Sequence, residues 1–131
     1  MNNKIFIIED DANILYGLAA QLGAIGFQVE TESGGEKTEE IIKKIKIFTP
    51  DFVILDLILP RLDGFSLLEA IKSDKEINTS VFIFTNLSDE DSRARGSRLG
   101  ADYYFIKNDF SIIEFTEKIK NIIKNLAKKG K

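Results

Sequence analysis

Short apolar runs alternate along the chain with stretches in which apolar residues recur every three or four positions. Four of the runs are long and continuous enough to be strands buried on both faces. These are Lys4–Ile8, Phe52–Leu55, Ser80–Thr85 and the "DYYFI" that begins at Asp102. "FQVETE", from Phe27, instead alternates apolar and polar residues, as a strand with one solvent-facing side does. The pattern therefore predicts five strands.

A helical stripe follows each of these strands. Apolar residues from Ala12 to Ile25 predict the first helix, and Gly26 is placed to cap its C-terminus. Ser33 and Glu36 have capping-box spacing and are expected to open the second helix. The third and fifth helices are expected over Gly64–Asp74 and Phe110–Leu126. Ser88 and Asp91 are expected to start the fourth helix, which should end near Gly100. In the last helix, the side chains expected to face the core are those of Ile112, Phe115, Ile119, Ile122 and Leu126.

Strands and helices in strict alternation predict an α/β protein, a single doubly wound parallel sheet with helices on both faces. The 131 residues are enough for one domain with a core and too few for two. We expect one domain over 1–131, with its core at about 4–126 and a short basic tail at 127–131. Sheets of this kind bind ligands beyond the carboxyl ends of their strands.

The composition narrows the possible chemistry. The chain has no cysteine and no histidine, which excludes disulfides, thiol nucleophiles, imidazole bases and nearly all zinc or copper sites. A net charge of −3 argues against a nucleic-acid surface. No apolar stretch approaches the roughly 20 residues that cross a bilayer, and the N-terminus does not resemble a signal peptide. We therefore expect a cytoplasmic protein without membrane insertion.

Polar residues from four separate segments fall at the carboxyl edge of the expected sheet. Glu9 and Asp10 follow the first strand, Asp56 follows the third, Thr85 ends the fourth and Lys107 follows the fifth. A lone Asp after a strand is commonly a turn former, but a coincidence of four segments favours a site. Three carboxylates in one cleft repel each other unless a cation joins them, and Mg²⁺ suits oxygen ligands.

Such a site suits Asp56 as a nucleophile that forms an aspartyl phosphate. Mg²⁺ on one side and the Lys107 ammonium on the other would offset the charges of the carboxylate and the phosphoryl group. The Thr85 hydroxyl could donate a hydrogen bond to a phosphoryl oxygen.

Four motifs resemble, in order and spacing, the receiver domain of two-component response regulators, the CheY-like family. They are "IFIIEDDANIL", "PDFVILDLILPRLDG", the strand-end Thr of "VFIFTN", and "GADYYFIK". The resemblance spans about Lys4 to Leu126 and implies the flavodoxin-like strand order 2-1-3-4-5. It also implies that Asp10 binds Mg²⁺ directly, Glu9 through water, and that Asp56 and the Ile58 backbone carbonyl are further ligands.

The resemblance further implies that Asp56 accepts a phosphoryl group from the phosphohistidine of a sensor histidine kinase or phosphotransfer protein. Thr85 and Lys107 would read the phosphorylated state, and Tyr104 falls at the family's switch aromatic. The fourth helix, fifth strand and fifth helix would then signal to a downstream protein. We expect no direct DNA binding within the chain. We expect no enzyme beyond a phosphoacceptor that catalyses its own phosphotransfer and slow dephosphorylation.

Several positions depart from the family pattern. Lys107 is followed by Asn108 instead of proline, so we expect a trans or mobile peptide there and a less tightly fixed Lys107. Asn86 replaces a small residue and could either narrow access to Asp56 or hydrogen-bond the phosphoryl group. Apolar Ile58 and Leu87 predict a long-lived phosphoryl state, because apolar groups cannot orient the hydrolytic water.

The fourth helix is expected to be poorly anchored. Between Leu87 and Leu99, its one apolar side chain is Ala94, and Gly96 lies in its middle. Three arginines make its exposed face basic, which suits either an acidic partner or plain solvation.

Other classes fit the sequence less well. A flavodoxin-like cofactor binder would need a phosphate cradle after the first strand, where "EDDAN" is acidic. A haloacid dehalogenase-type phosphohydrolase would need a second Asp at the position of Ile58. The main alternative is a receiver-like interaction module that works without phosphorylation.

Overall fold

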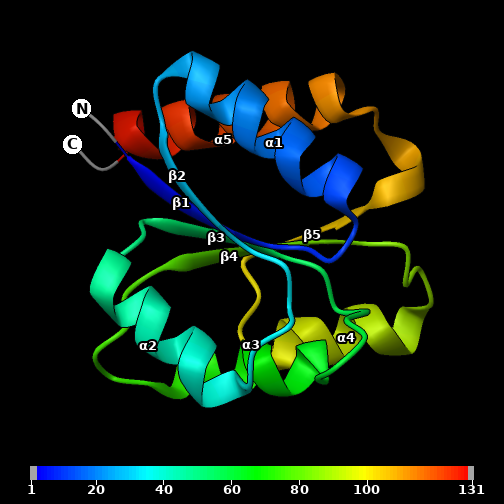
Figure 1. Ribbon diagram of the computed structural model, residues 1–131. Helices are drawn as coiled ribbons and strands as arrows, with labels where there is room; N and C mark the ends of the chain where they lie inside the picture. The colour runs from blue at the N-terminus through cyan, green and yellow to red at the C-terminus, as the bar shows by residue number, and fades with distance from the viewer. Residues whose placement is uncertain (1–2, 130–131) are drawn as a thin grey trace.

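The computed structural model describes residues 3–129, and its five strands form one parallel sheet in the order β2-β1-β3-β4-β5 (Figure 1). The strands are β1 (Lys4–Ile8), β2 (Gln28–Glu32), β3 (Phe52–Leu55), β4 (Ser80–Thr85) and β5 (Tyr103–Ile106). The helices are α1 (Ala12–Ile25), α2 (Thr38–Phe48), α3 (Gly64–Ser73), α4 (Glu90–Arg98) and α5 (Ile112–Lys129). The doubly wound α/β fold predicted from the sequence is confirmed.

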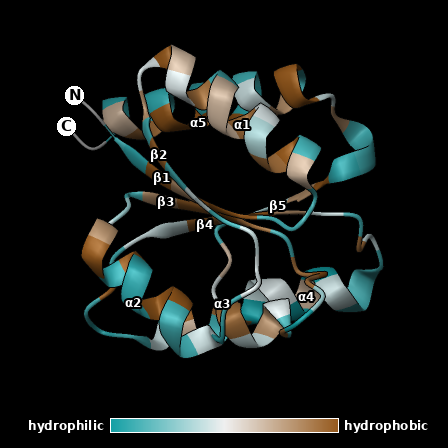
Figure 2. Cartoon of the chain, in the orientation of Figure 1, coloured by the Kyte–Doolittle hydropathy of each residue, from teal (hydrophilic) through white to brown (hydrophobic). Residues whose placement is uncertain are grey.

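Helices cover both faces of the sheet. Helices α1 and α5 lie on one face, and α2, α3 and α4 lie on the other (Figure 1). Successive side chains of a strand point to opposite faces, so each central strand supplies two cores. In β1, Ile5 and Ile7 pack beneath α1 and α5, whereas Phe6 and Ile8 pack on the α2 and α3 side. The hydrophobic colouring accordingly follows the central strands (Figure 2).

Both ends of α1 are capped, and the C-terminal cap is the one predicted. The Asp11 side chain accepts hydrogen bonds from the backbone N–H groups of Asn13 and Ile14, and this satisfies the first turn. Gly26 closes the helix with φ +117°, a left-handed conformation that glycine adopts without strain. Asp11 is therefore a helix cap in this structure.

The predicted caps of two other helices are wrong. Helix α2 begins after Lys37, which makes no side-chain cap, and Ser33 and Glu36 precede it in a turn. The buried Glu32 carboxylate holds that turn by accepting the Gly34 N–H at 2.9 Å. Helix α4 is capped by Asp89, which accepts the Ser92 N–H, and not by Ser88 or Asp91.

The inward face of α5 also differs from the prediction. Its buried residues are Phe115, Thr116, Ile119 and Ile123, whereas Leu126 is 38% exposed and Ile122 is half-buried. Ile112 and Ile122 are partly buried and still pack against the core, so the prediction fails at Leu126 and omits Thr116 and Ile123. The helix continues through Lys129, so residues 127–129 of the expected tail are helical, and residues 130 and 131 lie outside the described residues.

Within residues 3–129, no helix combines the length and the apolar character that a bilayer crossing requires.

Candidate functional site

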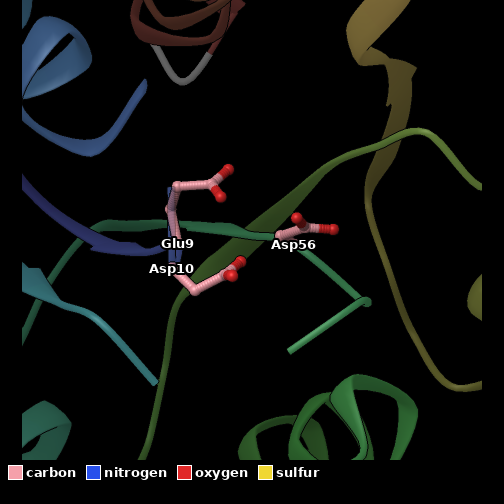
Figure 3. Close-up of side chains that lie close together, drawn as sticks. All are labelled: Glu9, Asp10 and Asp56. Atoms are coloured by element: carbon pink, nitrogen blue, oxygen red, sulfur yellow. The ribbon is translucent and has the colours of Figure 1, made fainter. Parts of the chain in front are cut away.

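Three carboxylates meet at the carboxyl edge of the sheet. Glu9 and Asp10 directly follow β1, and Asp56 directly follows β3. The two strands pair in parallel up to Ile8 and Leu55, so their ends bring the acids together (Figure 3). One oxygen from each carboxylate lies within 4.8 Å of the others, and residues 3–129 hold no second cluster of this kind.

The side chain of Lys107 joins two of these acids. Its Nζ lies 2.7 Å from Glu9 Oε1 and 2.7 Å from Asp56 Oδ2. The ammonium thus has two partners in this structure, and the looser hold expected without a following proline stays a prediction. The predicted trans peptide is confirmed, since no cis bond occurs in residues 3–129. A 3-10 turn, Lys107–Asp109, follows β5 and carries the lysine into the site.

Burial and hydrogen bonding together set the pKa values of Glu9 and Lys107. Burial raises the pKa of Glu9 above its ordinary value, even though the hydrogen bond from Lys107 opposes this shift. Burial alone would lower the pKa of Lys107, but hydrogen bonds to Asp56 and Glu9 outweigh it and raise that pKa. The lysine therefore stays charged, and its ammonium group is shared by two of the three acids, Glu9 and Asp56.

The donor set fits a hard divalent cation. It consists of carboxylate oxygens, with Glu9 and Asp56 buried and Asp10 exposed to solvent. Mg²⁺ prefers a few carboxylates together with water and phosphoryl oxygens, and an additional positive charge would relieve the repulsion among these acids. Receiver domains bind Mg²⁺ at such an acidic pocket.

Asp56 is held at both of its oxygens. Oδ2 faces the Lys107 ammonium, and Oδ1 accepts the backbone N–H of Ile58 at 3.0 Å. Ile58 lies in the loop after β3 with its side chain 52% exposed, and this loop bridges back to Asp63. The role of the Ile58 carbonyl as a metal ligand stays a prediction.

Thr85 and Tyr104 are linked through the backbone of Leu87. The Leu87 N–H donates to the Thr85 hydroxyl oxygen at 3.4 Å, and the Leu87 carbonyl accepts from the Tyr104 hydroxyl at 2.7 Å. Thr85 is fully buried at the end of β4, and Tyr104 is half-buried on β5. Sequence reasoning considered only the apolar side chain of Leu87, because a backbone contact leaves no signal in residue type.

Helix α4 contacts the same tyrosine. The guanidinium of Arg93 lies 5.5 Å from the centre of the Tyr104 ring, within the range of a cation–π contact. A methyl group at Gly96 would come within 3.2 Å of that ring, so the glycine lets the helix approach closely. These two α4 contacts were not identified from the sequence.

Comparisons with known sequences agree with this geometry. The family described as the response regulator receiver domain matches residues 5–120. "Probable transcriptional regulator ycf27" of Porphyridium aerugineum is 34% identical over 125 residues, which are 95% of this chain and 50% of the relative. "Alkaline phosphatase synthesis transcriptional regulatory protein PhoP" of Bacillus subtilis (strain 168) is 33% identical over 124 residues, which are 95% and 50% of the two chains. The chain thus spans about half the length of these curated relatives.

Solved structures give the same result. A CheY-like receiver domain protein from Methanospirillum hungatei JF-1 superposes with a TM-score of 0.82 at 24% identity, covering 98% of this chain and 99% of that one. This match shows the fold. The BeF3-activated receiver domain of DrrB, a Thermotoga maritima protein, superposes with a TM-score of 0.76 at 30% identity, covering 95% and 99%. The chain belongs to the response regulator receiver domain family of two-component systems.

Proposed function

We propose that this chain is a phosphorylation-controlled switch in which Asp56 accepts a phosphoryl group. The observation that carries the proposal is the buried Asp56 carboxylate, which lies between two other acids and the Lys107 ammonium. The donor would be the phosphohistidine of a sensor histidine kinase or phosphotransfer protein, because the family accepts phosphoryl groups from such partners. The downstream partner would be a protein that reads the altered surface.

Glu9, Asp10 and Asp56 would hold Mg²⁺, with the Ile58 carbonyl as a further ligand. When bound, Mg²⁺ supplies positive charge that offsets the phosphoryl oxygens and the attacking carboxylate. Asp10 is exposed and is the acid proposed to bind directly, whereas the buried Glu9 would act through water. Lys107, already charged and in contact with Asp56, would balance the phosphoryl group from the other side.

The transfer itself needs few groups. An Asp56 oxygen attacks phosphorus, a P–O bond forms, and the P–N bond to the donor histidine breaks with its electron pair going to the imidazole. Lys107 orients Asp56, since its ammonium lies 2.7 Å from Oδ2. The chain would thus catalyse its own phosphotransfer and, more slowly, its own dephosphorylation.

Phosphorylation would change the surface through Leu87. A phosphoryl group brings roughly two negative charges and would attract the Thr85 hydroxyl. Because Leu87 bonds to both Thr85 and Tyr104, a shift of the threonine would move the tyrosine ring beside α4. The surface of α4, β5 and α5 would then be biased between two arrangements.

Beryllofluoride uptake with Mg²⁺, followed by NMR, tests this function. We expect saturable, Mg²⁺-dependent shifts at Thr85 and Tyr104 in the wild-type protein and none in Asp56→Asn. Asp91→Asn removes an exposed acid on α4 and is the matched control that should respond normally. Acetyl phosphate should add one phosphoryl group by mass, again only when Asp56 is present. A wild-type protein that takes up neither reagent would leave the phosphorylation-independent interaction module as the better explanation.

A further inference from the structure

The pairing of β4 with β5 ends immediately before the site. The last paired residues are Thr85 and Ile106, and the next residues along the two strands are Asn86 and Lys107. The lysine whose ammonium reaches Glu9 and Asp56 therefore lies just beyond the regular backbone ladder. Some other contact has to fix the direction in which the chain leaves β5.

The side chain of Asn86 makes such a contact. Its Oδ1 accepts the backbone N–H of Asn108 at 3.2 Å, joining segments 22 positions apart in the sequence. The bond joins the residue after Thr85 to the second residue after Ile106, so it continues the link between the two strands past their last pair, with a side-chain amide in place of a backbone carbonyl. A second bond, from the Phe110 N–H to the Lys107 carbonyl at 3.2 Å, closes the 3-10 turn.

We propose that Asn86 is a positioning residue for Lys107. By holding the Asn108 N–H, it fixes the turn from which the lysine side chain reaches the two buried carboxylates. This inference rests on the proposed function, because it assigns Asn86 a part in presenting Lys107 to the phosphoryl group. It is a further role beside the two that the sequence left open, because it uses the Asn86 oxygen as an acceptor, whereas a bond to the phosphoryl group would use the amide NH₂ as a donor.

Asn86 and Asn108 both depart from the family pattern, and one hydrogen bond joins them. A proline at position 108 would have no N–H and would need no acceptor. Asn108 has an N–H that emerges beside the end of β4, and the Asn86 amide is a residue type that can accept it. Both residues are exposed, so water can replace the bond when it is lost. Loss of the Asn86 amide should therefore loosen the turn without unfolding the domain.

Two measurements on the protein without phosphoryl group test the contact and its effect. In Asn86→Ala, hydrogen exchange of the Asn108 amide should speed up by about threefold to tenfold, the size expected for one exposed hydrogen bond. The Lys107 ammonium should also become more mobile by NMR relaxation. Asn86→Asp keeps an acceptor of the same shape, so the Asn108 amide should stay protected in that variant.

A mutant cycle tests the link to phosphorylation. Asn86→Ala should weaken Mg²⁺-dependent beryllofluoride binding by about threefold. The loss should be the same in the Asn108→Ala background, which keeps the N–H, and should disappear in the Asn108→Pro background, which lacks it. An equal loss in all three backgrounds would overturn the proposal.

The exchange and relaxation data decide the proposal even where Asn108→Pro fails to fold. Unchanged Asn108 exchange in Asn86→Ala would show that the contact is absent in solution. Faster exchange of the Asn108 amide with unchanged mobility of the Lys107 ammonium would show that the contact does not position the lysine. A wild-type protein that ignores beryllofluoride would refute the phosphoacceptor function, and these two measurements would still report on the contact.

Discussion

At the scale of single residues, the site depends on one ammonium group shared by two buried acids. Lys107 touches Glu9 and Asp56 at equal distances of 2.7 Å, so neither acid is left buried without a partner. An uncompensated buried carboxylate is costly, and for this reason such charges are normally paired or bound to a metal. The remaining acid, Asp10, is exposed to solvent, so no burial cost has to be offset by a protein partner.

The apolar residue two positions after Asp56 predicts slow loss of the phosphoryl group. Ile58 is 52% exposed at the entrance to the site, and an aliphatic side chain cannot orient a hydrolytic water. We expect Ile58→Asn to speed dephosphorylation on the order of tenfold, less than the 10²–10⁴ of a full general base. Ile58→Val, which stays apolar, is the control, and radiolabel retention is the measurement. Rapid label loss in the wild-type protein, unchanged by Ile58→Asn, would contradict this prediction.

The residues at the strand ends could be predicted because each follows or ends an apolar run of clear length. This holds for the three acids of the site and also for Thr85 and Lys107. All of them lie at the carboxyl edge of the sheet. The contacts of Leu87 and Asn86 could not be predicted, because they depend on the paths of two loops. The contact of Lys107 with Glu9 was missed for the same reason.

At the scale of elements, α4 is expected to be the least stable helix. Its nine residues bury only Gly96, whereas α5 buries four residues along one face. Stabilisation of a helix in a protein comes mainly from packing of its apolar face, so α4 should open locally at low cost. Hydrogen exchange should show amides of α4 exchanging well before those of α5. Equal protection of the two helices would refute the expectation.

Two glycines offer a matched test of close approach. A methyl group at Gly64, the first residue of α3, would overlap the Leu57 backbone, whereas one at Gly23 in α1 would meet nothing within 4 Å. Gly64→Ala should lower the free energy of unfolding by about 1–3 kcal/mol or more. Gly23→Ala should raise it by about 0.5–1 kcal/mol, because alanine favours the helix. Urea denaturation measures both, and similar effects of the two changes would contradict the steric argument.

Helix boundaries show where sequence patterns are weakest. The capping-box spacing of Ser33 and Glu36 was a real pattern, but Gly34 adopts φ +83° and the buried Glu32 holds it in a turn. Helix α2 therefore starts later, at Thr38. The apolar periodicity predicted each helix, whereas the contact between Glu32 and Gly34 determines where α2 begins.

At the scale of the whole molecule, metal binding should stabilise the fold. A ligand at ten times its dissociation constant stabilises the native state by about 1.4 kcal/mol, which corresponds to roughly 5 °C in Tm for a domain of this size. Mg²⁺ should produce this shift in the wild-type protein, and EDTA should reverse it. Asp10→Asn should lose most of the shift, whereas Asp91→Asn should keep it. The same shift in Asp10→Asn would argue against the proposed ligand set.

The overall architecture could be predicted from the sequence more fully than the individual contacts could. Continuous apolar strands indicated burial on both faces, and the two cores confirm this. The strand order came instead from the resemblance, since periodicity alone does not say which helices share a face. The observed arrangement puts α1 beside α5 although most of the chain separates them (Figure 1).

The last turns of α5 lie beside the start of β1. Asn3, Phe27 and Ala127 line one hollow there, at the amino-terminal edge of the sheet. Strands of this length place that edge about 15 Å from the acids. A fluorescent dye attached near Ala127 would therefore lie well away from the proposed cation site and leave its carboxylates free.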